Sequence, residues 1–188
     1  MSILWLIVSI VLAAPPAAAE EGMTFGDLQG RTVEVKVISD RTIFKNGRRF
    51  PSRAETSLHV EFGPGDTVSH KHTAKVTGPR GTRQTPALMG KFVLSKSRPV
   101  GSRGGGRAMY TFSEQTLTFV RTFRKGAFKY SVSFARTGAG GLTCVVRGSF
   151  AREGGRGSIE LVNPFDGRPI KIVSYKQVSS DCRVKARD

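Results

Sequence analysis

The sequence predicts an all-β fold, a single antiparallel barrel or closed meander of about eight to ten short strands. Apolar and polar residues alternate in short runs, which is the two-residue period of a strand with one buried face. Glycine, proline and asparagine separate these runs at nearly regular spacing, which favours a barrel or sandwich over packed helices. No long linker or internal repeat interrupts the pattern, so we expect one domain over residues 20–188.

The first half of the chain contains the clearest alternation. Val33, Val35 and Val37 alternate with charged residues, and Asn46-Gly47 further on is a strong tight-turn signal. Leu58, Val60 and Phe62 form the next run and end at a Gly-Pro-Gly-Asp turn. Further strands are expected at residues 68–76, 90–94, 110–112, 142–151, 158–162 and 170–178.

Residues 116–135 predict a β-hairpin. A two-residue turn at Lys125-Gly126 would pair Phe123 with Phe128, and would place Arg121 opposite Tyr130. A four-residue loop is an alternative that keeps the same side chains on the same face.

Residues 1–19 resemble an export signal. An apolar run over 3–14 is followed by two prolines and then Ala17-Ala18-Ala19, the small-residue pattern that precedes cleavage. The competing interpretation is a membrane anchor, but a spanning helix needs about 20 apolar residues. We therefore expect cleavage after Ala19, no stable membrane anchor, and a periplasmic or extracellular protein.

Cys144 and Cys182 are the two cysteines of the chain, and in an exported protein an even number predicts a disulfide. Two free thiols are the alternative. The bridge would close a loop of 39 residues, counting both ends, and would hold the charged C-terminal tail.

His70 and His72 are two residues apart, so they share one face of the expected strand. Matching the apolar face of residues 58–62 turns both histidines inward or into a barrel mouth, whereas Glu55, His59 and Glu61 fall on the opposite face. A ligand site at His70, His72, Arg121 and Tyr130 is the resulting hypothesis. A metal site is not expected, since two imidazoles are too few ligands.

The chain is strongly basic, with 30 Lys and Arg against 14 Asp and Glu and a net charge of +16. Several arginines lie in glycine-rich loops, where guanidinium groups suit phosphate, sulfate or carboxylate partners. Candidate anion-binding residues are Arg80, Arg103, Arg107 and Arg156. A solvated surface that keeps the protein soluble is the alternative. An anionic envelope component would fit such loops, and nucleic acid is a less favoured partner.

Signatures of common enzyme classes and of cofactor-binding loops are absent from the sequence, so neither catalytic residues nor a cofactor are predicted. Glu114, Glu153, Asp166 and Asp181 are available carboxylates, but nothing in the sequence pairs them with a histidine.

The export signal, Asp40-Arg41, and the stretches at 141–144, 153–155 and 179–182 resemble small exported β-rich proteins of rhizobia and related alphaproteobacteria. That resemblance implies an exported, barrel-like domain with one disulfide and implies no activity. The strand layout is also similar to that of lipocalins and avidins. Those families use tryptophans that residues 20–188 lack, because Trp5 is the chain's one tryptophan.

The favoured function is a non-enzymatic, exported binding protein whose ligand is a small apolar molecule or an anion. An enzyme that combines His70 and His72 with a turn carboxylate is the second hypothesis. A structural or inhibitory module that acts through protein contacts is the third.

Overall fold

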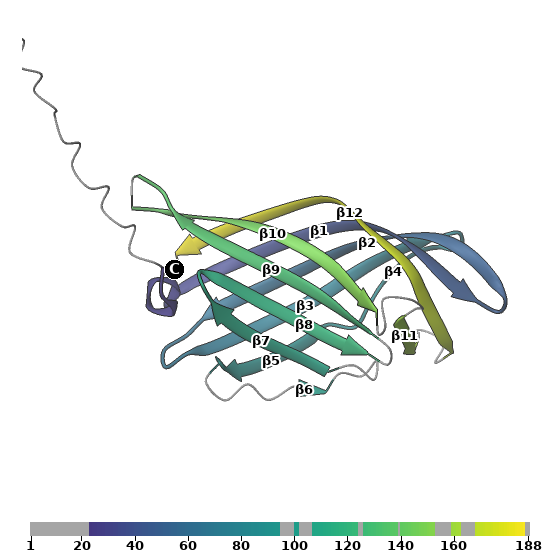
Figure 1. Ribbon diagram of the computed structural model, residues 1–188, viewed down its shortest axis with the longest axis horizontal. Coiled ribbons are helices and arrows are strands. Elements are labelled where there is room, and N and C mark those ends of the chain that lie inside the picture. Colours follow the sequence, from purple (N-terminus) through teal and green to yellow (C-terminus); the bar gives the residue numbers. More distant parts are fainter. Residues whose placement is uncertain are drawn as a thin grey trace, which may run out of the picture.

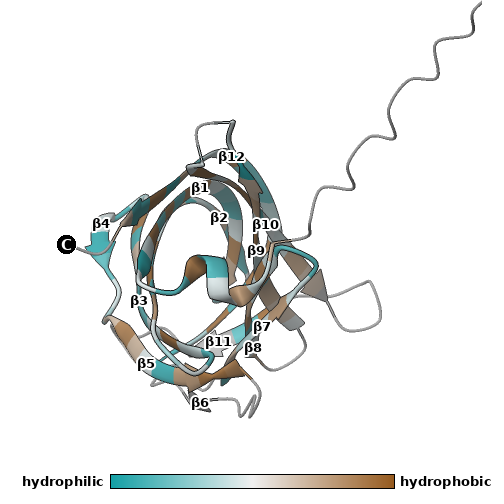
Figure 2. Cartoon of the chain, turned by 90° about the vertical axis from the view of Figure 1, so that its left-hand side faces the viewer, coloured by the Kyte–Doolittle hydropathy of each residue, from teal (hydrophilic) through white to brown (hydrophobic). Residues whose placement is uncertain are grey.

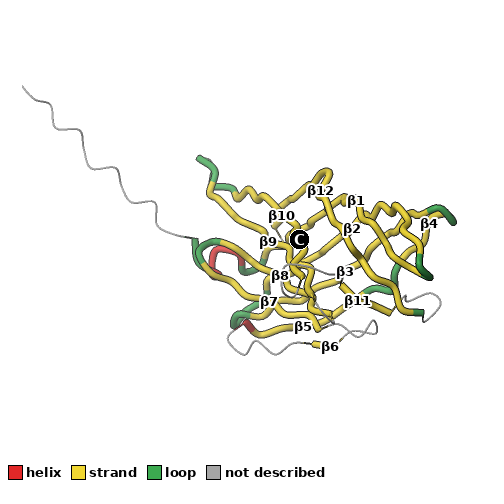
Figure 3. Tube along the Cα trace, turned by 45° about the vertical axis from the view of Figure 1, so that its right-hand side comes forward, coloured by secondary structure: helices red, strands yellow, loops and turns green. Residues whose placement is uncertain are grey.

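The computed structural model describes residues 23–94, 100–101, 107–123, 126–138, 140–152, 159–162 and 168–186. These residues form one short 3-10 helix, η1 (Phe25–Leu28), and twelve strands. Figure 3 shows that nearly all of the described chain is strand. The strands are β1 (Arg31–Lys45), β2 (Arg48–Phe62), β3 (Thr67–Gly78), β4 (Gly81–Gln84), β5 (Leu88–Val93), β6 (Val100–Gly101), β7 (Arg107–Ser113), β8 (Thr116–Phe123), β9 (Gly126–Arg136), β10 (Leu142–Arg152), β11 (Ile159–Val162) and β12 (Pro169–Ala186).

The strands form two antiparallel sheets (Figure 1). The larger sheet has the order β11-β12-β1-β2-β3-β4, and β5 also pairs with β3. The smaller sheet has the order β10-β9-β8-β7-β6. The all-β prediction is therefore confirmed. Among the described strands no backbone hydrogen-bond ladder joins one sheet to the other. The described strands therefore form two sheets, and the closed barrel that was predicted is not confirmed.

The predicted strands were too short and too few. β1 and β2 are 15 residues each, and β12 has 18 residues and continues to Ala186. The C-terminal tail is thus a strand that pairs with the first half of β1, not a frayed end held only by the disulfide. Cys182 and Val184 are partly buried and alternate with exposed charged residues, which is the strand pattern.

Local turn chemistry explains the first hairpin. Lys45 pairs with Arg48, which leaves Asn46-Gly47 as a two-residue turn, as predicted. Both turn residues have positive φ, 50° for Asn46 and 75° for Gly47, and asparagine and glycine adopt this region most readily. The register of β1 on β2 follows from this turn.

The hairpin of β8 and β9 has the predicted faces but not the predicted register. Arg121 pairs with Phe128, two residues away from its predicted partner Tyr130, which pairs with Phe119 instead. Phe123 pairs with Gly126, so Gly126 belongs to the strand and not to the turn. Because a shift of two residues leaves every side chain on its original face, the core of this hairpin is as predicted.

Buried apolar side chains fill the space between the two sheets, here called the interior. Figure 2 shows strands of both sheets curving around it, with η1 across the near end. The Phe25 ring packs on Phe62 of β2 and on Phe112 of β7, at centroid distances of 5.5 and 5.9 Å. The Arg136–Asp27 ion pair, at 2.8 Å, fastens η1 to β9. η1 therefore closes this end of the interior.

Side chains join β10, the edge strand of the smaller sheet, to β12 of the larger sheet. Cys144 of β10 and Cys182 of β12 form the predicted disulfide, with Cα atoms 5.6 Å apart. Gln177 of β12 accepts a hydrogen bond from the Gly148 backbone N–H at 2.5 Å and donates to the Val146 carbonyl at 3.4 Å. A side-chain amide thus takes the place of a ladder between β10 and β12.

The expected export signal at residues 1–19 lies outside the described residues. Among the residues that are described, no helix is long and apolar enough to span a membrane.

Candidate ligand site

The interior changes from apolar to polar with distance from η1. On β1 the inward residues Val33, Val35 and Val37 are followed by Ser39 and Arg41. β2 runs antiparallel to β1 and shows the same change from apolar to polar. Its apolar residues Phe62, Val60 and Leu58 lie near η1, and its polar residues Thr56 and Ser52 lie farther away. The far half, here called the polar end, contains Ser39, Arg41, Ser52, Thr56, His72, Arg121, Tyr130 and Tyr175.

His70 and His72 both face the interior, as the strand parity predicts, and are only 5% and 6% exposed. They pair with Val60 and Leu58 of β2. His70 stacks on Phe92 at 5.0 Å and also contacts Tyr110 and Phe119, at 5.3 and 5.6 Å. Neither ring nitrogen of His70 has a hydrogen-bond partner among the described residues.

Burial lowers the pKa of both histidines, and the nearby Arg121 guanidinium lowers them further. The pKa of His70 is about 4 and that of His72 is about 3. His70 and Arg41 add to the effect on His72. Both rings are therefore neutral at physiological pH, and each neutral ring offers one donor and one acceptor nitrogen.

Arg121 and Tyr130 lie beside the histidines on the opposite sheet. The Tyr130 ring centroid is 6.4 Å from that of His72, and its hydroxyl donates to Thr56 Oγ1 at 3.5 Å across the interior. The Arg121 guanidinium lies 4.9 Å from the Phe123 ring centroid. Burial, followed by the charge of Arg41, lowers the pKa of Arg121, although Tyr130 acts in the opposite direction. The four predicted site residues thus come together.

Arg41 was not predicted. It comes from β1, and its Nε donates to Ser39 Oγ at 3.0 Å. Its guanidinium lies 4.8 Å from the Phe128 ring centroid and 5.6 Å from that of Tyr175. In the strand ladders Arg41 has Ser52 on one side and Tyr175 on the other. The sequence does contain a signal for Arg41, because the alternation of Val33, Val35 and Val37 places position 41 on the same inward face.

Ser52 and Tyr175 complete the polar end. Ser52 is 7% exposed, and its hydroxyl has no hydrogen-bond partner among the described residues. The Tyr175 hydroxyl is buried, and burial is the main cause that raises the pKa of Tyr175 to about 12. Tyr175 therefore keeps its proton at neutral pH, and both side chains present hydroxyl groups next to Arg41 in the strand ladders.

Carboxylates of the described residues lie mainly on the outer face of the sheets. Glu55 pairs with Lys36 at 2.7 Å, and His59 with Glu61 at 3.4 Å, which agrees with the predicted side for all three residues 55, 59 and 61. Asp181 pairs with Arg183 at 3.1 Å, and Glu114 is an exposed turn residue. Among the described residues no three His, Cys, Asp or Glu side chains converge as a metal site would require.

The predicted anion-binding loops are only partly described. Arg80 is exposed in the turn between β3 and β4, and Arg107 is exposed at the first residue of β7. Arg103 and Arg156 lie outside the described residues, as do the carboxylates Glu153 and Asp166.

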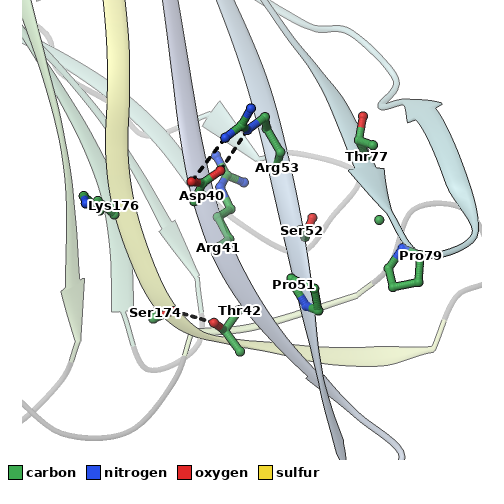
Figure 4. A pocket seen from close by; sticks show the side chains of 11 residues that line it. Asp40, Arg41, Thr42, Pro51, Ser52, Arg53, Thr77, Pro79, Ser174 and Lys176 are labelled. Carbon is green, nitrogen blue, oxygen red and sulfur yellow. Dashed lines mark hydrogen bonds and ion pairs between the residues drawn. The ribbon is translucent and has the colours of Figure 1, made fainter.

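Two hollows adjoin the larger sheet. One has a volume of about 570 Å³ and is lined by Arg41 and Ser52 of the polar end together with Asp40, Thr42, Arg53, Ser174 and Lys176, among others. In Figure 4, Asp40 and Arg53 form two hydrogen bonds, at 2.8 and 3.3 Å, and the Ser174 hydroxyl donates to Thr42 Oγ1. The other, of about 590 Å³, is lined by the charged residues Glu34, Lys36, His59, Lys71, Asp181 and Arg183, among others. Asp181 and Arg183 pair with each other, whereas Glu34, Lys36 and His59 pair with Lys185, Glu55 and Glu61. The second hollow is therefore a weaker candidate than the polar end, and the first hollow borders the polar end through Arg41 and Ser52.

Fold and site together define the class of protein: an all-β protein with two antiparallel sheets, one disulfide and a buried polar cluster between the sheets. Comparison of the chain with protein-family models, with curated proteins and with solved structures found no match.

Proposed function

We propose that the protein is an exported, non-enzymatic binding protein that holds a small ligand at the polar end of the interior. The observation that carries the proposal is a set of buried polar groups without hydrogen-bond partners among the described residues: the Ser52 hydroxyl at the polar end and the ring nitrogens of His70, the neighbour of His72 on the same face of β3. Leaving a buried polar group unsatisfied costs about 1–3 kcal/mol. A bound ligand would offset that cost by supplying the missing partners.

Two further features support export and a closed interior. Disulfides persist in oxidising compartments, so the Cys144–Cys182 bridge is compatible with the signal-like pattern at residues 1–19. The Gln177 bonds to β10 lie beside that bridge. On this basis we extend the proposal to a barrel-like, lipocalin-like enclosure and to kinship with the small exported β-rich proteins of rhizobia that the sequence resembles.

The enzyme hypothesis gains no support from the site. Burial keeps His70 and His72 neutral with pKa values of about 4 and 3, far from the value near 7 that suits a general base. The charged side chains that lower their pKa values are arginines: Arg121 for both histidines, and Arg41 in addition for His72.

Native mass spectrometry of the protein exported by its own signal tests the proposal. We expect a mass excess that leaves on collisional activation, together with cleavage after Ala19. The excess should fall in the double variant His70→Gln/His72→Gln and persist in His59→Gln, whose imidazole lies on the outer face. A wild-type protein that shows only the mass of the mature chain would contradict the binding proposal.

A further inference from the structure

Arg41 and Arg121 reach the polar end from opposite sheets. Arg41 belongs to β1 of the larger sheet and Arg121 to β8 of the smaller one. Phe128 connects them, because the Arg41 guanidinium lies 4.8 Å from its ring centroid and Arg121 is its direct cross-strand partner. The two positive charges are close enough that Arg41 lowers the pKa of Arg121.

Two guanidinium groups in a partly buried space repel each other, since the low dielectric constant strengthens the interaction. Asp40, the carboxylate next to Arg41 in sequence, lies on the outer face and is bonded to Arg53. The neutral histidines bring no negative charge, and burial raises the pKa of Tyr175 to about 12, so its hydroxyl keeps its proton at neutral pH. An anion placed between the guanidinium groups would turn this repulsion into attraction.

The donors around the two arginines suit an oxyanion. Arginine presents paired N–H groups in a planar fork that matches carboxylate and phosphate oxygens. Ser52 is the cross-strand neighbour of Arg41 and adds a hydroxyl that is buried and without a partner among the described residues. Aromatic rings of Phe128 and Tyr175 form the surrounding wall, and they contact the Arg41 guanidinium.

We propose that the polar end binds an oxyanion, the carboxylate or phosphate group of a small ligand, between Arg41 and Arg121 with Ser52 as an additional donor. This inference rests on the proposed function and names the chemical class of its ligand. Arg41 is only partly buried, so the site keeps contact with solvent. The outward Arg49 of β2 is also an arginine but is exposed, and it provides a matched control.

The test is isothermal titration of the purified protein with sodium phosphate and, separately, sodium benzoate, against chloride at constant ionic strength. We expect saturable binding of at least one probe, and the preferred probe tells a phosphate ligand from a carboxylate ligand. Arg41→Gln and Arg121→Gln should each weaken binding at least tenfold, and Arg49→Gln should not change it. Ser52→Ala should weaken binding several-fold. Because this substitution is the smallest of the three, it still tests the site if an arginine variant does not fold.

A thermal-shift experiment gives an independent measure. At ten times its dissociation constant the bound probe should raise the Tm of the wild type by about 3–5 °C. Absence of saturable binding by both probes, or equal affinities in Arg41→Gln, Arg121→Gln and the wild type, would overturn the inference. If a neutral ligand is retained in native mass spectra while both probes fail, the oxyanion site is wrong and the binding function stands. A bare mass together with failure of both probes contradicts both.

Discussion

The Tyr175 hydroxyl occupies the place where a Cβ on Gly148 would stand. Gly148 lies opposite Tyr130 in the β9–β10 ladder, and a Cβ there would also meet Tyr130 Cε1 at 3.2 Å and Gln177 Oε1 at 3.1 Å. Glycine at this position therefore lets β12 place a tyrosine into the polar end and lets Gln177 join β10 to β12.

Gly148→Ala should destabilise the protein by about 1–3 kcal/mol, because the new methyl group overlaps the buried Tyr175 hydroxyl. Urea denaturation measures the change. Tyr175→Phe removes the overlapping oxygen, so Gly148→Ala should cost less in that background. Gly138→Ala is the control, since nothing lies within 4 Å of its added Cβ. Equal costs with and without the Tyr175 hydroxyl would contradict the described contact.

Removal of the disulfide should lower stability without dismantling the sheets. Cys144 and Cys182 are 38 residues apart, and closing such a loop contributes about 4 kcal/mol on the chain-entropy model. The double variant Cys144→Ser/Cys182→Ser should therefore unfold at lower urea while its far-ultraviolet circular dichroism stays that of a β protein. An unchanged urea midpoint would show that the bridge does not stabilise this fold.

Gln177→Ala should loosen the junction of β10 and β12. The change removes the acceptor of the Gly148 N–H and a donor to the Val146 carbonyl, for a loss of about 1–3 kcal/mol. Hydrogen exchange should accelerate at the Gly148 amide and stay unchanged at amides of the β1–β2 ladder. Uniform acceleration across both sheets would instead indicate a global effect.

Acid should destabilise the protein through His70 and His72. Their folded pKa values, about 4 and 3, lie below the ordinary value of about 6.5, so the unfolded state binds more protons and stability falls as the pH drops below 6.5. Each histidine contributes up to about 1.4 kcal/mol per pH unit down to about pH 4. Denaturation midpoints between pH 7 and 4 measure the slope.

The double variant His70→Gln/His72→Gln should lose most of this slope, because glutamine does not titrate. His59→Gln should retain it, since His59 is partly exposed on the outer face. A slope as steep in the double variant as in the wild type would assign the acid sensitivity to other groups.

The sequence predicted those structural features that are determined by residues close together in the chain or by residue type alone. Asn46-Gly47 fixes its turn by its own backbone preference, and two cysteines leave one possible pairing. Alternation placed His70 and His72 inward because side-chain direction follows parity. The β8–β9 register was wrong by two residues because a period of two fits both registers equally well.

What the sequence could not predict depends on contacts between distant strands. Arg41 and Arg121 are 80 positions apart in the sequence, and their approach follows from how the two sheets face each other. An inward arginine also breaks the apolar alternation that Val33, Val35 and Val37 begin. The Tyr175 fit against Gly148 likewise requires the path of β12 beside β10, which no local pattern contains.

The most direct test of the oxyanion site is a crystal structure of the protein with sodium selenate, whose selenium scatters anomalously. We predict an anomalous peak between the guanidinium groups of Arg41 and Arg121, within hydrogen-bond reach of Ser52 Oγ, and loss of that peak in Arg41→Gln. Selenate found only at exposed arginines such as Arg49, with the polar end empty, would contradict the account.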